Sequence, residues 1–275
     1  MNIAQIFTDY LDGLANSRLA LRSPSVLVPF LVFGLLQMLL LSALAFFDWP
    51  PIAPLMLPVV RALGGDAAIH YPAHFALLPR VWDSVYLPLV ATIGFSLWTL
   101  AVWVMVGHHE VGRRVPSRRF RALLPGVIGV GVVFVGVSAG LGRAAAWLAG
   151  YAPAGNAAQI SLVAAIALVA VAQSLLVYAP VVLRIRGVNA LSATVASVRY
   201  ALRNFWPTVL VVATVLAIHA PLDILIGNSD RVAVRFHPEM VYVILLGSIA
   251  LEMITAYLLF ASVVGLALPE EGGLR

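Results

Sequence analysis

Six long apolar stretches constrain this chain more than any other feature of its sequence. A helix that crosses a bilayer core of about 30 Å needs roughly 20 apolar residues. Stretches of that length occupy residues 26–47, 85–107, 122–141, 160–182, 206–226 and 240–268. Backbone N–H and C=O groups in hydrocarbon must be paired within their own segment, and these stretches lack the alternation of barrel strands. We therefore predict an all-α polytopic membrane protein with six transmembrane helices.

The composition agrees with lipid as the main solvent of the side chains. Hydrophobic residues make up 62% of the chain and charged residues 11%, whereas soluble domains carry about 25% charged residues. The chain has no cysteine, which excludes disulfides, thiolate metal sites and cysteine nucleophiles. Because the net charge of +5 is spread over the connections, we expect membrane lipids as partners, with other membrane proteins possible and nucleic acid excluded.

The arginines predict the orientation of the chain. With the amino terminus inside, twelve of the seventeen basic residues lie on the inner side. The five on the outer side are Arg61, Arg80, Arg143, Arg231 and Arg235. The positive-inside bias then predicts a bacterial inner-membrane protein with both termini in the cytoplasm. The first apolar run is too long for a cleaved signal, so we expect residues 1–25 to be retained.

Two predicted cytoplasmic segments, residues 1–25 and 184–205, have amphipathic helical patterns. The apolar positions are Ile3, Ile6, Phe7, Tyr10, Leu11 and Leu14 in the first, and Val188, Leu191, Val195, Val198, Leu202 and Phe205 in the second. Each segment is interpreted either as a lipid-sensing or partner-docking surface or as a connector packed at the membrane interface. Residues 48–84 form a predicted outer loop, and the whole chain is predicted to be a single integral membrane domain.

The two amphipathic segments also resemble each other. The sequence ANSRLALRSPSVLV (15–28) aligns with ASVRYALRNFWPTV (196–209), and SRRFRALLPGV (117–127) is a looser third instance. Each instance precedes a span that runs outward, which suggests three helical-hairpin repeats related by an axis along the membrane normal. Arginine before a span is expected in any case, so chance similarity is the alternative.

The stretch from residue 178 to 212 carries a further pattern. Ala179-Pro180 ends one span, Ala193 to Ser197 matches an A-hydrophobic-x-x-S helix, and Arg203-Asn204-Phe205-Trp206 leads into the next span. In this pattern and in its six-span layout the chain resembles the YciC-like proteins and the membrane domains attached to some glycerophosphodiester phosphodiesterases. The resemblance implies an integral membrane fold. It transfers no catalytic residue, because the phosphodiesterase chemistry belongs to a soluble domain without a counterpart in these 275 residues.

One acidic residue, Glu252, lies in the middle of the last apolar stretch. A carboxylate at mid-bilayer costs about 2.5–3.5 kcal/mol on insertion scales, so we expect it to face the bundle interior, partnered or protonated. His219 and Asp223, four residues apart in the preceding span, are its candidate partners. The three residues are predicted to form a proton or cation path. The alternative is that Glu252 is neutral, hydrogen-bonded and acts only in packing, with Asp223 at the outer interface of the membrane.

The other candidate residues lie at the membrane surfaces. His70 and His74 have the i, i+4 spacing of zinc ligands and, with His237, could form an outer metal site. Lipid head-group contacts are predicted for Arg113, Arg114, Arg118, Arg119, Arg121, Arg199 and Arg203. In the third span, glycines that include the Gly136-xxx-Gly140 pair predict close helix–helix approach.

No catalytic motif stands in a credible context, so we predict that the chain is not an enzyme and has no cofactor. The predicted function is that of a multi-pass inner-membrane component that docks a partner or handles lipid. The alternative is a small secondary transporter or channel that uses Glu252 with His219 and Asp223.

Overall fold

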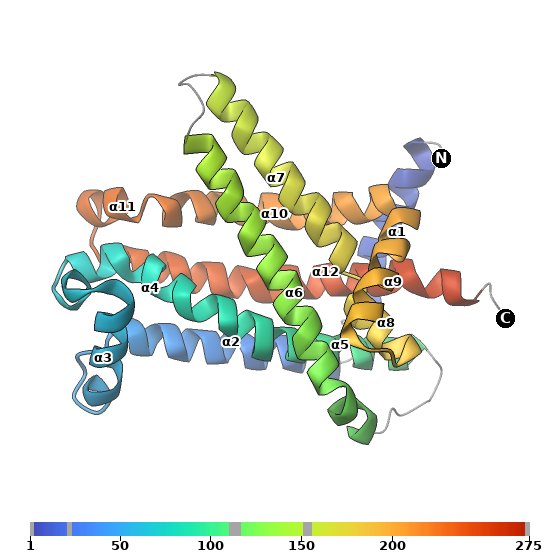
Figure 1. The fold of residues 1–275 in the computed structure, drawn as a ribbon, viewed down its shortest axis with the longest axis horizontal. Helices are drawn as coiled ribbons and strands as arrows, with labels where there is room; N and C mark the ends of the chain where they lie inside the picture. Colours follow the sequence, from blue (N-terminus) through green and yellow to red (C-terminus); the bar gives the residue numbers. More distant parts are fainter. Residues whose placement is uncertain (1–2, 21–23, 110–116, 151–155, 273–275) are drawn as a thin grey trace. The chain divides into compact units, whose positions relative to one another are not determined.

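The computed structural model describes residues 3–20, 24–109, 117–150 and 156–272, and within these ranges the chain is helical and contains no strand (Figure 1). The larger helices, in chain order, are α1 (Ile3–Ala20), α2 (Pro24–Ala45), α3 (Ala53–Gly64), α4 (Ala73–Leu89), α5 (Phe95–His109), α6 (Ser117–Gly150), α7 (Asn156–Leu176), α8 (Ala179–Arg186), α9 (Ala190–Arg203), α10 (Phe205–Gly227), α11 (Ser229–Arg235) and α12 (Met240–Gly272). A 3₁₀ turn, η1 (Asp66–Ile69), and a π-helical turn, η2 (Val90–Gly94), complete them. Six helical segments of the described chain are long and apolar enough to span a membrane, which confirms the predicted all-α polytopic fold.

The second span differs most from its predicted limits. It runs over Ala73–Gly107 instead of 85–107 and so includes part of the predicted outer loop. Arg80 and Asp83 interrupt the apolar run without interrupting the helix, because both side chains are exposed on its surface. Pro88 has no N–H for the carbonyl of Ser84, and the wide turn η2 follows it directly.

The fourth span is built from two helices. The described part of α7 ends at Leu176, and α8 begins at Ala179 with a proline in its first turn, a position that needs no N–H donor. Gly187, with φ 61°, ends α8 in the left-handed conformation that favours glycine. The Asn189 side chain then accepts a hydrogen bond from the Ser192 N–H and begins α9.

The contacts between residues divide the chain into two compact units. Unit 1 consists of Met1–Phe30, Val90–Leu216 and Ala256–Arg275, and unit 2 of Leu31–Leu89 and Ala217–Thr255. Helices α2, α10 and α12 each contribute residues to both units.

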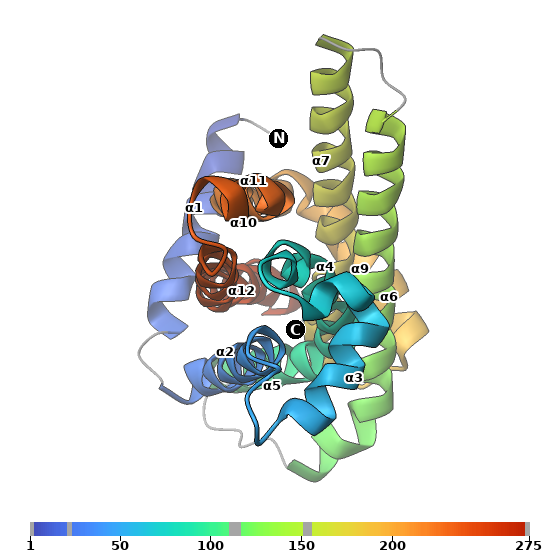
Figure 2. The same cartoon turned by 90° about the vertical axis from the view of Figure 1, so that its left-hand side faces the viewer.

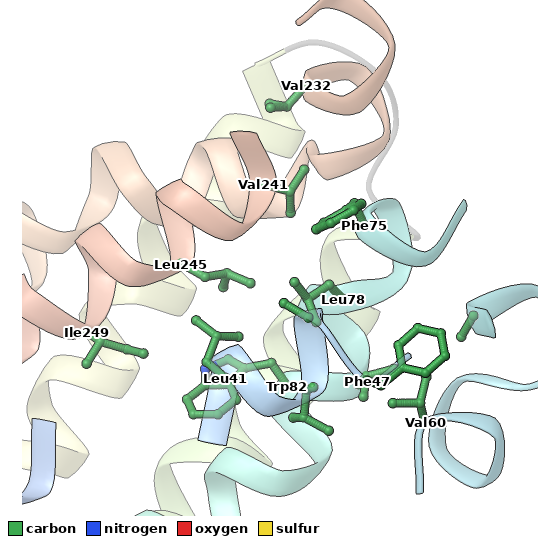
Figure 3. Close-up of a cluster of buried hydrophobic side chains, with 14 residues drawn as sticks. Leu41, Phe47, Val60, Phe75, Leu78, Trp82, Val232, Val241, Leu245 and Ile249 are labelled. Atoms are coloured by element: carbon green, nitrogen blue, oxygen red, sulfur yellow. The ribbon is translucent and has the colours of Figure 1, made fainter. Parts of the chain in front are cut away.

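Unit 2 has an apolar core formed by α2, α3, α4, α11 and α12 (Figure 3). Leu41, Leu78, Trp82, Leu245 and Ile249 are all buried in it. At its edge the Ser42 and Tyr242 hydroxyls are 2.8 Å apart, joining α2 to α12, and Ser229 donates to the Ala76 carbonyl at 3.0 Å. The polar groups at the boundary of this core are therefore hydrogen-bonded to one another.

In unit 1, α6 and α7 lie side by side as an antiparallel pair (Figures 1 and 2). Among the ring pairs of this unit, Phe95 packs on Phe134 and Trp98 on Phe260, with ring centroids 5.6 and 5.7 Å apart. The Tyr178 hydroxyl lies 2.7 Å from that of Thr208 and joins the α7–α8 turn to α10.

The glycine prediction for the third span is wrong in its details. A Cβ atom on Gly136 or Gly140 would meet no neighbour within 4 Å, so neither allows a close approach in the described chain. Gly131 does, because a Cβ atom there would overlap the Ala91 carbonyl oxygen and crowd Phe95. The G-xxx-G spacing identifies a smooth helix face, but only the fold decides which glycine meets another helix.

We expect Gly131→Ala to lower the stability of the protein in detergent by about 1–3 kcal/mol, because overpacking displaces α6 from η2 and α5. Gly136→Ala, the matched control, should change stability by less than about 1 kcal/mol, since its added methyl group meets open space. Thermal unfolding followed by tryptophan fluorescence measures both. Equal losses in the two variants would contradict the packing assigned to Gly131.

Candidate functional site

A polar contact lies among the apolar helices of unit 2. Glu252, halfway along α12, accepts a hydrogen bond from the Tyr86 hydroxyl of α4, with 2.8 Å between the hydroxyl oxygen and Oε1. The Glu252 residue is partly buried. No ion pair to Glu252 is formed in the described part of the chain. The expectation that this carboxyl has a polar partner is therefore met, by a residue that sequence analysis did not name.

A second polar side chain, Gln37 of α2, lies beside the same carboxyl. Gln37 is 0% exposed, and neither its amide nitrogen nor its amide oxygen makes a hydrogen bond of good geometry. An unpaired buried polar group costs about 1–3 kcal/mol. Gln37, Tyr86 and Glu252 form the group that we call the carboxyl site; they come from three helices of unit 2.

His219 of α10 makes a different contact from the one expected. Its Nε2 lies 2.6 Å from the Thr255 hydroxyl, one turn beyond Glu252 on α12. The Thr255 hydroxyl also lies 3.0 Å from the Leu251 carbonyl oxygen and 3.3 Å from the Glu252 carbonyl oxygen, so the contact ties His219 to this turn of α12. Asp223 lies exposed one turn further along α10. The structure shows no hydrogen bond from His219 or Asp223 to the Glu252 side chain.

The three outer histidines do not come together. Both ring nitrogens of the buried His74 face backbone carbonyls, Nδ1 at 2.8 Å from Ala68 and Nε2 at 3.1 Å from Ala45. His70 is exposed, and His237 lies 3.9 Å from the Glu239 carboxylate. No cluster of three His, Asp or Glu side chains suited to a metal ion occurs among the described residues.

Next to this surface, Tyr71 is close to Glu239. Partial loss of hydration, and then the charge and hydrogen bonding of the Glu239 carboxylate, raise the pKa of the Tyr71 hydroxyl above its usual value of 10.0. His237 and Tyr71 are thus both neighbours of Glu239, and the three side chains form a small polar group at this surface.

The predicted head-group arginines are only partly described. Arg113 and Arg114 lie outside the described residues, as do the side chains of Arg118 and Arg119. Arg121, Arg199 and Arg203 are exposed. Of these, Arg199 lines an open groove of about 370 Å³ beside α9 in unit 1. The lining of this groove, which we call the α8–α9 groove, consists of Arg186, Val188, Leu191, Ser192, Val195, Ala196 and Arg199.

Arg186, at the end of α8, was not among the arginines predicted to contact lipid. Its guanidinium donates to the Tyr200 hydroxyl at 3.1 Å and lies 5.4 Å from the centre of the Tyr200 ring. Sequence analysis counted Arg186 only as an inner positive charge, because its position in the groove depends on how α8 packs on α9.

No family model, curated protein or solved structure matches this chain. Functions can therefore be assigned to these sites only from the chemistry of the residues that form them.

We expect His74→Leu to destabilise the protein by about 1–3 kcal/mol, because leucine offers no ring N–H to the backbone carbonyls of Ala68 and Ala45. His70→Leu is the control, since His70 is exposed. Thermal unfolding with and without added zinc separates the two hypotheses for these residues. If zinc stabilised the wild type and both variants lost that effect, His74 would be a metal ligand and the structural role would be wrong.

Proposed function

We propose that this multi-pass membrane protein binds an anionic phospholipid in the α8–α9 groove, which makes it a lipid-handling component of the membrane. The observation that carries the proposal is the pairing of two arginines, Arg186 and Arg199, with apolar side chains in one open groove. A phosphate group is recognised by guanidinium N–H donors, and an acyl chain by apolar surface.

The two guanidinium groups differ in how they are held. Tyr200 fixes Arg186 through a hydrogen bond and a cation–π contact, which lowers the entropy that Arg186 loses on binding. Arg199 is exposed on α9 and supplies a second positive charge at the groove. A rigid donor together with an adaptable one suits a phosphate group whose orientation varies with its lipid.

The surroundings of the groove favour a lipid over a free anion. Helix α9 has a buried face that consists of Tyr200 and four small residues, Ala193, Ala196, Ser197 and Ala201. Its larger apolar side chains point outward, and Leu191, Val195 and Leu202 are 76%, 49% and 61% exposed. Such a stripe is typical of a helix that lies in the membrane interface, where it would meet acyl chains.

We expect Arg199→Gln and Arg186→Gln each to weaken the binding of an anionic phospholipid about fivefold, since one basic residue near such a lipid contributes about 1 kcal/mol. The measurement is native mass spectrometry of the purified protein titrated with phosphatidylglycerol, with phosphatidylcholine as the zwitterionic comparison.

Arg143→Gln is the matched control, because Arg143 is an exposed arginine of α6 that does not line the groove. It should bind phosphatidylglycerol as the wild type does. Equal losses in all three variants, or equal affinity of the wild type for the two lipids, would contradict the proposed groove.

We further propose that the protein resides in a bacterial inner membrane with both termini in the cytoplasm, as the arginine distribution supports. Because the chain lacks cysteine, single cysteines can be introduced at exposed positions to report the side of the membrane. Arginines are left in place, since they are the basis of the predicted orientation. We expect an impermeant thiol reagent applied to intact cells to label Ala67→Cys and Asp230→Cys. It should reach Gln5→Cys and Ser192→Cys only after permeabilisation. The reverse pattern would overturn the proposed orientation.

A further inference from the structure

We propose that Glu252, Gln37 and Tyr86 form a proton-binding site within the membrane-spanning helices. The inference is independent of the lipid groove, since its three residues belong to unit 2 and the groove to unit 1.

The Glu252 carboxyl has no fixed positive partner among the described residues. In the described chain, Glu252 is bonded to a tyrosine hydroxyl and forms no ion pair. A buried arginine or lysine would hold a carboxyl permanently in its charged form, whereas a neutral hydroxyl allows either form. Tyr86 donates to an ionised carboxylate and, equally, to the carbonyl oxygen of a protonated carboxyl group.

The Gln37 amide lies beside the Glu252 carboxyl but makes no hydrogen bond of good geometry with it. A carboxylate only accepts hydrogen bonds, while a protonated carboxyl also donates one. An amide carries two donors at its nitrogen and an acceptor at its oxygen, and these exchange places when the terminal torsion turns by about 180°. Gln37 can therefore complement Glu252 in both of its states without any other ion.

The burial of Gln37 indicates that its position beside Glu252 is not due to chance. The side chain is 0% exposed and both of its polar atoms are without a partner of good geometry. In an apolar helix a leucine at this position would fill space without leaving polar groups unpaired. The amide of Gln37 instead lies next to Glu252, the carboxyl group of the last span, where both its donor and its acceptor can form hydrogen bonds.

The surrounding titratable groups set the local field. From α4 the site is faced by Tyr86 and Asp83, and from α10 by Asp223 and His219. The unit 2 portion of α2 contributes no titratable side chain. The His219 ring and the Thr255 hydroxyl form a second polar contact one turn along α12 from Glu252.

The test is an infrared difference titration of the full-length protein in lipid nanodiscs. Beyond the bands of its other acidic residues, the wild type should show the carbonyl stretch of one further protonated carboxyl group, which disappears as the pH rises. Glu252→Gln, which is nearly isosteric, should lack this band while keeping its helical circular dichroism. If the wild type and Glu252→Gln gave the same titration, Glu252 would not exchange a proton and the proposal would be overturned.

Two further measurements identify the ligand and the part played by the amide. Gln37→Leu should shift the titration midpoint by about one pH unit, because a leucine beside the carboxyl cannot turn a donor toward its charged form as the amide can. Leu36→Ala, a neighbouring apolar change in α2, should leave the titration midpoint unaltered. An unchanged midpoint in Gln37→Leu would overturn the role of the amide. The midpoint should be the same in sodium, potassium and choline buffers, and a sodium-dependent midpoint would overturn the proton as ligand.

Discussion

The structure depends on one constraint, which is that polar groups in hydrocarbon must find their partners within the protein. The backbone meets it by forming helices. Hydroxyl side chains meet it by bonding to the carbonyl four residues earlier, as Thr99, Ser174 and Thr208 do at 2.7 Å. These bonds satisfy the hydroxyl hydrogen locally, so serine and threonine can occur inside spans whether or not a second helix offers a partner, as Tyr178 does for Thr208. The groups that local bonding cannot satisfy, such as a carboxyl or an amide, are then the ones for which the tertiary fold must provide.

The constraint also explains which parts of the fold the sequence could predict. The six spans follow from length and hydropathy alone, because both are local properties of the chain. The beginning of α4 was missed because Arg80 and Asp83 lower the local hydropathy, so the predicted span began after them although the helix itself includes both. The contact of Gly131 was missed for another reason, because Gly131, Gly136 and Gly140 have similar sequence surroundings and of these only Gly131 meets η2. A pattern shows that close approach is allowed, but its location depends on the register between helices.

The candidate sites divide in the same way. Glu252 could be found from the sequence because a lone acid in an apolar run is costly wherever the helix lies. Its partner Tyr86 is separated by 166 residues and resembles an interfacial tyrosine near the end of a predicted span. Gln37 offered a weaker signal, as an amide within the first apolar stretch, and it was not recognised. His219 and Asp223 lie on one helix, as predicted. At the depth of His219, however, α12 presents Thr255 and not the Glu252 side chain.

The two proposed sites use polar groups for opposite purposes. At the α8–α9 groove, the permanent charge of arginine is useful because an anionic lipid must be attracted whatever the pH. The chain also places Arg184 in unit 1, where its guanidinium lies 5.0 Å from the centre of the Trp103 ring. It therefore tolerates arginine among its helices, yet beside Glu252 it has an amide and a phenol. A fixed charge there would keep the carboxyl ionised, and neutral groups that both donate and accept leave its proton free to exchange.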